Sequence, residues 1–385
     1  MLRSMPPASV AAVVTDPPYG LSDVSSADTV QALTAWVSGD RERVPNGKGF
    51  MGNKWDRFVP PPAVWDECYR VLKPGGYMAV FAGSRTADLM GLSIRLAGFE
   101  MRDTITWMYG NGFPKSLNIG KAINKSEVTS IQQWEGWGTA LKPASEPIIV
   151  ARKPFLGTVA ANVLEHGTGG MNIDGCRVSP NGDNMFRTRN TALGVMNDDG
   201  WQPQHQESNG HVDGRWPANV VLSHTGWCDE GYCEDGCPVA ELDAQSGQLT
   251  SGKPGIKHFG NNGAAYGAES RPPGTQMGGF GDTGGASRFF NTFRYQAKAP
   301  KSERPVVNGV AHPTVKPRAL MEWLVTLFTP TYGTVLDPFT GSGTTGEAAL
   351  RLGFNSVVME RDQKYWPLID KRLGDYLDSL KKKVS

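Results

Sequence analysis

The first 150 residues alternate between short apolar runs and stretches in which apolar residues recur at helical spacing. Val10 to Val14 is a valine-rich run that stops at Asp16-Pro17-Pro18, a pattern typical of a buried strand that prolines end. A motif at residues 16–19 therefore lies at the carboxyl end of a strand. The same half of the chain predicts helices over 62–72 and 85–96, and strands over 77–81, 104–109 and 147–151.

Order of the same kind returns after Pro313. The pattern predicts helices over 319–328, 345–352 and 365–380, and strands over 334–336 and 356–359. A series of strand, helix and strand is typical of a parallel sheet with helices on its faces. Both ends of the chain therefore predict an α/β fold with a mostly parallel, doubly wound sheet.

Residues 151–310 have a different texture and hold 26 of the 47 glycines. Such a segment predicts loops with little periodic structure. No internal repeat is visible, which argues against a solenoid or a propeller. We therefore expect three parts, which are residues 1–153, 154–305 and 306–385.

The composition is that of a folded globular protein, with 39% hydrophobic and 20% charged residues among 385. These values exclude a disordered tail, a collagen or a coiled coil as the main structure. The formal net charge is +1, so a site for a polyanion must be local. No apolar run approaches the roughly 18 residues that span a bilayer, and the first residues do not form a signal-peptide core. We expect a cytoplasmic protein without membrane contact.

A glycine-rich turn from Asp337 to Gly346 links a predicted strand to a predicted helix. Its glycines let the backbone approach a ligand, and the helix N-terminus offers free N–H groups. Glu360 ends the next strand, where its carboxylate can accept hydrogen bonds from two ribose hydroxyls. These features predict a cofactor that contains a nucleoside. The pattern Gly-x-Gly-x-x-Gly also fits NAD, a tight turn without a ligand is the plainer alternative, and the missing Gly-Lys-Ser/Thr excludes a Walker phosphate loop.

The second motif is Asp16-Pro17-Pro18-Tyr19. Its prolines fix the backbone so that the Asp16 carboxylate and the Pro17 carbonyl point the same way. This pair can accept both N–H bonds of a planar amine on a heterocycle, while Tyr19 stacks on the ring. For an isolated copy, a proline-capped turn is a nearly equal interpretation. Its combination with the glycine-rich turn favours the functional one.

In this order, with a long region between them, the two motifs resemble those of amino-directed DNA methyltransferases that use S-adenosylmethionine. The catalytic motif precedes the cofactor motif, as in the circularly permuted beta group of that family. Further matching strings are Val71-Leu72-Lys73-Pro74-Gly75-Gly76, Phe81-Ala82-Gly83 and His312-Pro313-Thr314-Val315-Lys316-Pro317. Within the group, the chain is most similar to phage and prophage adenine methylases, which share the strings at 138–143 and 172–177.

The resemblance implies a Rossmann-like methyltransferase fold that is circularly permuted and carries a loop-rich insertion. Residues 1–153 would form its catalytic half, and 306–385 the half that binds S-adenosylmethionine. Residues 154–305 would recognise the target in double-stranded DNA. Neither the recognition sequence, the oligomeric state nor a restriction partner follows from the sequence.

The same resemblance implies the roles of single residues. Asp16, Pro17, Pro18 and Tyr19 would be catalytic: the target base is flipped out of the duplex, and its exocyclic amine attacks the sulfonium methyl directly. For Lys316, a solvated loop lysine is a nearly equal interpretation. By the same matching, cofactor contacts come from Asp337, Pro338, Phe339, Gly341, Gly343, Glu360, His312, Thr314 and Lys316.

The aspartate at the head of the catalytic motif favours adenine-N6 as the methylated amine, because cytosine enzymes more often carry serine there. Three alternatives stay open: a cytosine-N4 methyltransferase, a DNA-binding protein with weak or lost catalysis, and, more remotely, an NAD enzyme. Family members usually carry a Gly-Asp or Asp-Cys pair shortly before the catalytic motif, and its Asp contacts the cofactor's adenine. No such pair precedes Asp16. This departure keeps the binding-only protein in consideration.

Three of the five cysteines and one histidine fall within fourteen residues, as His224, Cys228, Cys233 and Cys237. Four such ligands are the number that a structural zinc takes, although the spacing is looser than in a Cys-x2-Cys knuckle. Zinc and free or buried thiols are equally good interpretations, and a redox role is the least favoured.

Basic residues alternate with aromatic ones in the middle region, a pattern that suits phosphate contacts and stacking in DNA recognition. Ordinary surface charge over a small core is the alternative. The residues are Arg187, Arg189, Arg215, Lys253, Lys257, Arg271, Arg288 and Arg294, with Trp201, Trp216, Phe259, Phe289 and Phe290.

Overall fold

The computed structural model describes most of the chain. The described residues are 1–22, 24–47, 49, 54–110, 112, 116–123, 132–178, 214–225, 228, 232–251, 255–256, 276–277, 280–293 and 303–384.

Strands and helices alternate in the parts where the sequence predicts them. The first part forms β1 (Val10–Thr15), α1 (Ser26–Val37), α2 (Pro62–Val71), β2 (Leu72–Phe81), α3 (Ala87–Leu96), β3 (Glu100–Met108), α4 (Ile119–Ile123) and β4 (Ser145–Arg152). The middle part forms α5 (Val159–His166), β5 (Val220–Ser223), α6 (Pro238–Ser246), β6 (Leu249–Thr250), β7 (Gly255–Ile256), β8 (Gln276–Met277), β9 (Thr283–Gly284) and β10 (Asn291–Phe293). The last part forms β11 (Val306–Val307), β12 (Val310–Ala311), α7 (Arg318–Phe328), β13 (Thr334–Asp337), α8 (Thr344–Arg351), β14 (Asn355–Val358) and α9 (Trp366–Val384).

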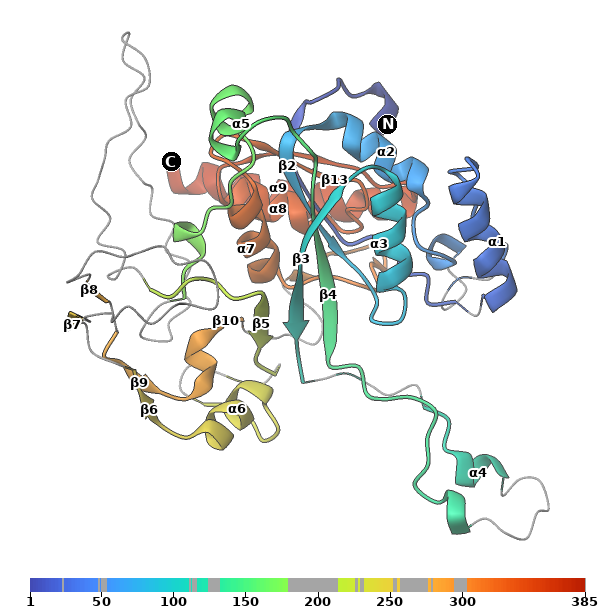
Figure 1. The fold of residues 1–385 in the computed structure, drawn as a ribbon, viewed down its shortest axis with the longest axis vertical. Coiled ribbons are helices and arrows are strands. Elements are labelled where there is room, and N and C mark those ends of the chain that lie inside the picture. The colour runs from blue at the N-terminus through green and yellow to red at the C-terminus, as the bar shows by residue number, and fades with distance from the viewer. Residues whose placement is uncertain are drawn as a thin grey trace, which may run out of the picture.

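Eight strands form one sheet in the order β10-β5-β3-β4-β2-β1-β13-β14 (Figure 1). Its neighbouring strands are parallel except where β4 takes part, because β4 runs antiparallel to both β2 and β3. A mostly parallel sheet with helices on both faces is the doubly wound α/β architecture. The predicted fold class is therefore confirmed.

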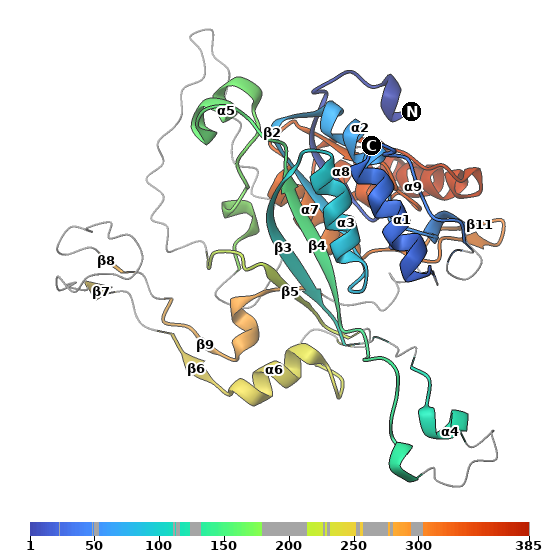
Figure 2. The same cartoon turned by 45° about the vertical axis from the view of Figure 1, so that its right-hand side comes forward.

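Alternate positions of β1 fill two apolar cores, one on each face of the sheet. Ala12 and Val14 belong to the core that contains buried residues of α7 and α8, whereas Val13 belongs to the core that contains those of α1, α2 and α3. Figures 1 and 2 show α7 and α3 on opposite sides of the sheet. A strand buried on both faces needs the continuous apolar run that the sequence has here.

The two motifs meet because β1 and β13 are parallel neighbours, with Ala12 opposite Val335 and Val13 opposite Leu336. From β1 the next strand is added on one side, as β2, and from β13 it is added on the other, as β14. The carboxyl ends of β1 and β13 therefore flank a topological switch point, which is where open α/β sheets bind ligands.

The start of β2 differs from the prediction. The pattern predicts that Pro74-Gly75-Gly76 closes the helix before a strand begins at Tyr77, but these three residues lie inside β2. The register against β1 jumps from Val10–Leu72 to Ala12–Tyr77, so the extra residues form a bulge. Gly75 has a φ of +74°, and a side chain there would collide with Asn162. The glycine thus belongs to a strand irregularity.

The pattern also does not predict α1 or the strands of the middle region. Only Ala32 and Trp36 of α1 are buried, so its apolar stripe is short. In the middle region, β5 pairs with β3 and β10 with β5, so the main sheet continues into this part of the chain. The division at 153 and 305 stays a prediction.

Two further features concern the outside of the fold. In the described part, no helix has the length and apolarity needed to cross a membrane. Figures 1 and 2 show α4 on an arm between the end of β3 and the start of β4, which projects away from the sheet.

Candidate active site

The catalytic motif follows β1 directly and has a fixed backbone. Gly20 has a φ of +66°, and a Cβ there would lie 2.8 Å from the nitrogen of Val59, so the position requires glycine. Asp56 Oδ1 accepts hydrogen bonds from the N–H groups of Tyr19 at 2.8 Å and of Gly20 at 3.0 Å. These contacts hold Tyr19 and the residues before it at the sheet edge.

Lys316 lies against the catalytic carboxylate. Its Nζ is 2.6 Å from Asp16 Oδ2 and 3.4 Å from Glu146 Oε2. The lysine is 8% exposed. Burial lowers the pKa of the ammonium, but the carboxylates of Asp16 and Glu146 outweigh it and raise the pKa above its usual value. Lys316 is therefore a charged, buried partner of Asp16 and not a solvated loop lysine.

Glu146 is a site residue that the sequence analysis did not identify. Its carboxylate accepts hydrogen bonds from the hydroxyls of Tyr19 at 2.8 Å and Tyr109 at 3.4 Å. Burial, with the charges of Asp16 and Glu146, raises the pKa of Tyr19 well above its usual value. Glu146 is the second residue of β4. Because β4 runs antiparallel to β2 and β3, its first residues lie at the edge of the sheet where those two strands end. Recognising β4 as antiparallel was the missing signal.

Aromatic rings complete the surroundings of the lysine. Lys316 Nζ lies 5.2 Å from the centroid of the Tyr19 ring and 4.9 Å from that of Phe81. Both distances are within the range of a cation–π contact. The ammonium is thus held by two carboxylates and two rings.

The buried carboxylate of Asp337 connects the two motifs by hydrogen bonds. Its carboxylate accepts hydrogen bonds from the hydroxyls of Thr15 and Thr345, each at 2.6 Å, and from the N–H of Phe339 at 3.1 Å. Burial raises the pKa of Asp337 to about 6, although these hydrogen bonds oppose the shift. Asp337 therefore ties β1 to β13 and to the start of α8.

Glu360 lies beside the glycine-rich turn, as predicted for a ribose acceptor. Its Oε2 accepts from the N–H of Gly341 at 3.0 Å and its Oε1 from that of Asp362 at 2.7 Å. Burial raises the pKa of the carboxyl group, against the effect of these N–H groups. Each carboxylate oxygen can accept a further hydrogen bond, so both could bind ribose hydroxyls. The ribose role stays a prediction.

His312 packs on the glycine-rich turn. A Cβ on Gly341 would lie 2.9 Å from the His312 ring. The ring stacks on Trp55 with centroids 6.2 Å apart and meets Tyr365 edge-on at 4.5 Å. Its Nδ1 contacts the Thr314 carbonyl, and burial lowers the pKa of the imidazole. The neutral ring is therefore the form expected at pH 7.

The remaining motif residues lie around the same edge. Gly343 has a φ of +85° and is the N-cap of α8. Pro17 is buried, Pro18 and Pro338 are half-buried, and the side chain of Thr314 is exposed.

A cleft opens between the two motifs. The Thr340 hydroxyl is buried at this cleft and has no hydrogen-bond partner within the described residues. An unpaired buried hydroxyl in a glycine-rich turn fits a site that a polar ligand completes. The cleft is lined by Asp16, His312, Thr314, Val315, Lys316, Met321, Asp337, Phe339, Thr340, Gly341, Ser342, Thr344 and Thr345.

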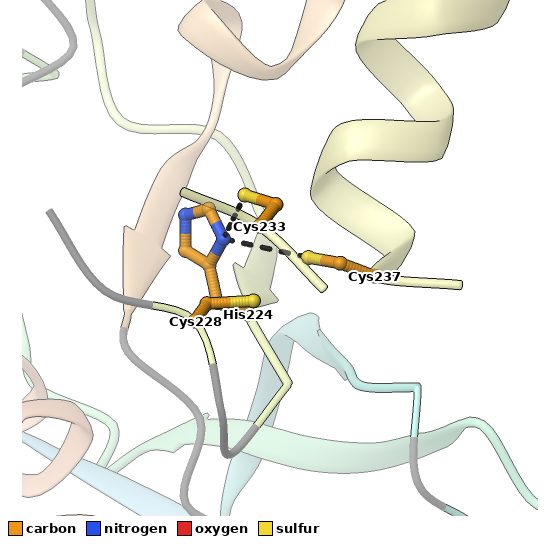
Figure 3. A group of neighbouring side chains, drawn as sticks. All are labelled: His224, Cys228, Cys233 and Cys237. Carbon is orange, nitrogen blue, oxygen red and sulfur yellow. Dashed lines mark hydrogen bonds between the residues drawn. The ribbon is translucent and has the colours of Figure 1, made fainter. Parts of the chain in front are cut away.

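The cysteine and histidine side chains predicted as metal ligands converge in space, at the end of β5 and the start of α6 (Figure 3). The ligand atoms of His224, Cys228, Cys233 and Cys237 all lie within 4.8 Å of one another.

Two arginines predicted to hold DNA phosphates are engaged inside the protein. Arg215 binds Asp282 through both oxygens, at 2.6 and 2.7 Å, and lies 4.9 Å from the Phe289 ring centroid. Arg288 is 8% exposed and also contacts Asp282. The expected phosphate role is therefore wrong for these two.

The aromatic residues of the predicted pattern differ in their surroundings. Trp216 is exposed and Phe290 packs against the small core around Cys237. The other predicted basic and aromatic residues, Arg187, Arg189, Trp201, Lys253, Lys257, Phe259, Arg271 and Arg294, lie outside the described residues.

Curated relatives share parts of the sequence. The chain is 28% identical over 182 residues to the type II methyltransferase M.HindIII of Haemophilus influenzae, across 43% of this chain and 59% of the relative. It is 44% identical over 65 residues to the type II methyltransferase M.HinfI of Haemophilus influenzae, across 17% of this chain and 18% of the relative. The chain thus spans about three fifths or less of the length of these relatives.

Two solved structures illustrate the structural comparison. The crystal structure of an M1.HpyAVI–SAM complex aligns with 95% of this chain and 89% of its own, at 15% identity and a TM-score of 0.36. The PvuII DNA methyltransferase, described as cytosine-N4-specific, aligns with 96% of this chain and 82% of its own, at 14% identity and a TM-score of 0.42.

A family model supplies the assignment. The N6_N4_Mtase model, described as DNA methylase, matches residues 10–371 and so includes both motifs and the region between them. The chain belongs to the N6_N4_Mtase family of DNA methylases.

Proposed function

We propose that this protein is a DNA methyltransferase that transfers a methyl group from S-adenosylmethionine to the exocyclic amine of adenine in double-stranded DNA. One observation carries the proposal: Asp16 and the turn from Phe339 to Ser342, far apart in the chain, line the same cleft. An acceptor for an amine thus stands beside a turn suited to a nucleoside cofactor.

The residues of the cleft fit S-adenosylmethionine. The Thr340 hydroxyl needs a partner, and Gly341 and Gly343 present no side chain at two positions of the turn. Beside the turn, Glu360 offers acceptors for ribose hydroxyls. Phe339, His312, Thr314 and Lys316 would complete its surroundings, with Asp337 and Pro338 shaping the turn. S-adenosylmethionine supplies the methyl group, which its sulfonium makes electrophilic.

Residues of the catalytic motif prepare the amine. Asp16 and the Pro17 carbonyl accept its two N–H bonds, and this favours the pyramidal form in which the nitrogen lone pair can attack. Tyr19 stacks on the flipped base, with Pro18 fixing the turn between them. The amine loses a proton after transfer, and the Asp16 carboxylate is the acceptor beside it. Lys316 holds one oxygen of Asp16 and so orients the other.

Adenine is preferred because an aspartate heads the catalytic motif. The runner-up is transfer to the N4 amine of cytosine, which needs the same pair of acceptors. The family name covers both amines, and the relatives named as type II methyltransferases suit a role in modifying DNA at specific sites.

The test is incubation of the full chain with unmethylated genomic DNA and labelled S-adenosylmethionine, followed by mass spectrometry of the nucleosides. Asp16→Asn removes the charge of the acceptor, and Asp40→Asn is the matched control because Asp40 is exposed and outside the cleft. We expect N6-methyladenine from the native chain and from Asp40→Asn, and at least a hundredfold less, on the order of one lost transition-state contact, from Asp16→Asn.

Other outcomes are equally informative. N4-methylcytosine in place of methyladenine would move the assignment to the runner-up. DNA binding without methyl transfer, and without binding of S-adenosylmethionine in calorimetry, would overturn the enzyme in favour of a DNA-binding protein.

A further inference from the structure

We propose that His224, Cys228, Cys233 and Cys237 bind one structural zinc ion, which fastens α6 to the end of β5. The site lies in the middle region and takes no part in the methyl transfer proposed above.

The distances match the edges of a zinc tetrahedron. His224 Nδ1 lies 3.4 Å from the sulfur of Cys233 and 3.4 Å from that of Cys237 (Figure 3). With zinc–nitrogen and zinc–sulfur bonds of about 2.1 and 2.3 Å, tetrahedral geometry puts such atoms about 3.6 Å apart. All four ligand atoms lie within 4.8 Å of one another. One ion at the centre can therefore reach every ligand after small side-chain movements.

Regular structure holds the first and last ligands. His224 directly follows β5, and its N–H donates to the Phe293 carbonyl of β10 at 2.8 Å. Cys237 directly precedes α6 and is fully buried. The convergence thus follows from the fold and not from one loop alone.

The second ligand has an orienting partner. The Thr225 hydroxyl lies 3.0 Å from the sulfur of Cys228, and the Cys228 N–H donates to the Thr225 carbonyl at 3.3 Å. Hydroxyl contacts of this kind orient a metal-bound thiolate and support its charge.

The core around the site is too small to explain the arrangement. Its buried members are Leu222, Cys237 and Val239 alone within the described residues. An apolar cluster gains nothing from an imidazole nitrogen aimed at two thiols, and a disulfide would use only two of the three sulfurs. Small cores of this kind are commonly completed by a metal.

The ligand set selects the metal and its role. Three thiolates and one imidazole form a soft, four-coordinate site that suits zinc. Because the protein supplies all four ligands, no position is left for water or substrate, and the ion is structural.

The ion would close a ring of contacts. Asp243 of α6 accepts from the N–H and the hydroxyl of Ser287, each at 2.7 Å, and the Ser246 hydroxyl accepts from the N–H of Ala286 at 2.9 Å. Ser287 belongs to a short helix, Ala286–Phe289, that leads into β10, and β10 pairs with β5. Hydrogen bonds thus connect α6 to the segment before β10, and β10 pairs with β5. The zinc would add a direct link between the end of β5 and the start of α6.

The experiment measures metal in the full native chain, purified without a histidine tag and without chelator. We expect about one zinc per chain by mass spectrometry of the metals, retained through dialysis. Cobalt exchanged into the same site should give the visible absorption of a tetrahedral thiolate complex.

Substitutions identify the ligands. Cys233→Ser and Cys228→Ser should each lower retained zinc by at least about tenfold. Cys68→Ala and Cys176→Ala are matched controls, since both thiols are buried in the main cores, and they should keep the full amount. Because the native chain is measured too, a variant that fails to fold does not decide the matter.

The proposal is overturned by a native chain that carries well under about one tenth of an equivalent of zinc, even after zinc is added, while Cys228, Cys233 and Cys237 react freely with a thiol reagent. Equal zinc in all four cysteine variants would overturn it as well, because the metal would then lie elsewhere. Neither result bears on methyl transfer.

Discussion

Lys316 Nζ lies 2.6 Å from Asp16 Oδ2, although 300 residues separate the two in the chain. The same ammonium is 3.4 Å from Glu146, so one buried cation serves two carboxylates. Removing one partner of a buried ion pair leaves an uncompensated charge, which costs about 3 to 5 kcal/mol. The arrangement therefore fixes Asp16 in one orientation and couples its charge to that of Glu146.

Replacing Lys316 by methionine should change the pH dependence of the reaction. Without the ammonium, the like charges of Asp16 and Glu146 face each other with no cation between them, and Asp16 loses the partner that holds its Oδ2. We expect the acid limb of the kcat/KM profile to move to higher pH, and kcat to fall by about tenfold to a hundredfold. The measurement is methyl transfer to DNA between pH 5 and pH 9.

Two further variants separate charge from shape at this position. Lys316→Arg keeps the charge and should restore most of the acid limb. Lys371→Met removes an exposed lysine that pairs with Asp375, and it should leave the profile unchanged. A Lys316→Met enzyme whose profile keeps its native shape would contradict a role through the charge of Asp16.

Glu146 should act through Tyr19. Glu146→Ala leaves the Tyr19 hydroxyl without the acceptor that it has at 2.8 Å, so we expect kcat/KM to fall by about tenfold to a hundredfold. Glu146→Gln keeps an acceptor oxygen and should lose less. In a Tyr19→Phe background the alanine substitution should cost clearly less than in the native chain. Independent, additive losses in this double-mutant cycle would separate the two residues.

The sequence predicts the site residues that depend on local patterns and misses contacts that depend on how distant strands pair. The sequence predicts Asp16 and Phe339 at strand ends, where the structure has them, because a short apolar run followed by proline or glycine is a local signal. Glu146 was missed because its role depends on the direction of β4, and direction is decided by pairing with strands distant in sequence. Lys316 was matched by its motif, yet its contact with Asp16 depends on the neighbouring positions of β1 and β13.

The same distinction applies in the middle region. Arg215 and Arg288 were expected at DNA phosphates because basic and aromatic residues alternate there. The structure instead shares Asp282 between both arginines and packs both against Phe289. The alternation of basic and aromatic residues is visible in the sequence, whereas the burial of Arg215 and Arg288 depends on tertiary contacts.

Gly341→Ala should weaken the binding of S-adenosylmethionine. The native φ is +54°, and the new Cβ would lie 2.9 Å from the His312 ring, so both the turn and the imidazole must move. We expect Kd to rise by about tenfold to a hundredfold, measured by calorimetry, because the turn and His312 both line the cleft.

The matched control is Gly374→Ala. This glycine lies in α9, and a Cβ there meets nothing within 4 Å. Alanine should leave the affinity unchanged and stabilise the helix by about 0.5 to 1 kcal/mol. Native affinity in Gly341→Ala would show that the turn does not contact the cofactor.

Asp337 should make the free energy of unfolding depend on pH in an unusual direction for a carboxyl group. Burial raises its pKa from 3.8 to about 6, so the native state binds the proton more tightly than the unfolded chain does. The stabilisation from the protonated group is complete below about pH 4 and is lost as the pH rises through about 6. A shift of about 2 units corresponds to about 3 kcal/mol.

Asp337→Asn removes this titration while it keeps polar atoms near Thr15, Thr345 and the Phe339 N–H. Urea unfolding of both proteins between pH 4 and pH 7.5 should therefore show the difference in free energy moving toward the variant by up to about 3 kcal/mol. The exposed Asp40→Asn is the matched control and should show a nearly constant difference over the same range, because the Asp40 side chain stays in contact with water in the folded protein. A constant difference for Asp337→Asn as well would mean that the native protein holds this carboxylate charged, with the three hydrogen bonds outweighing the cost of its burial.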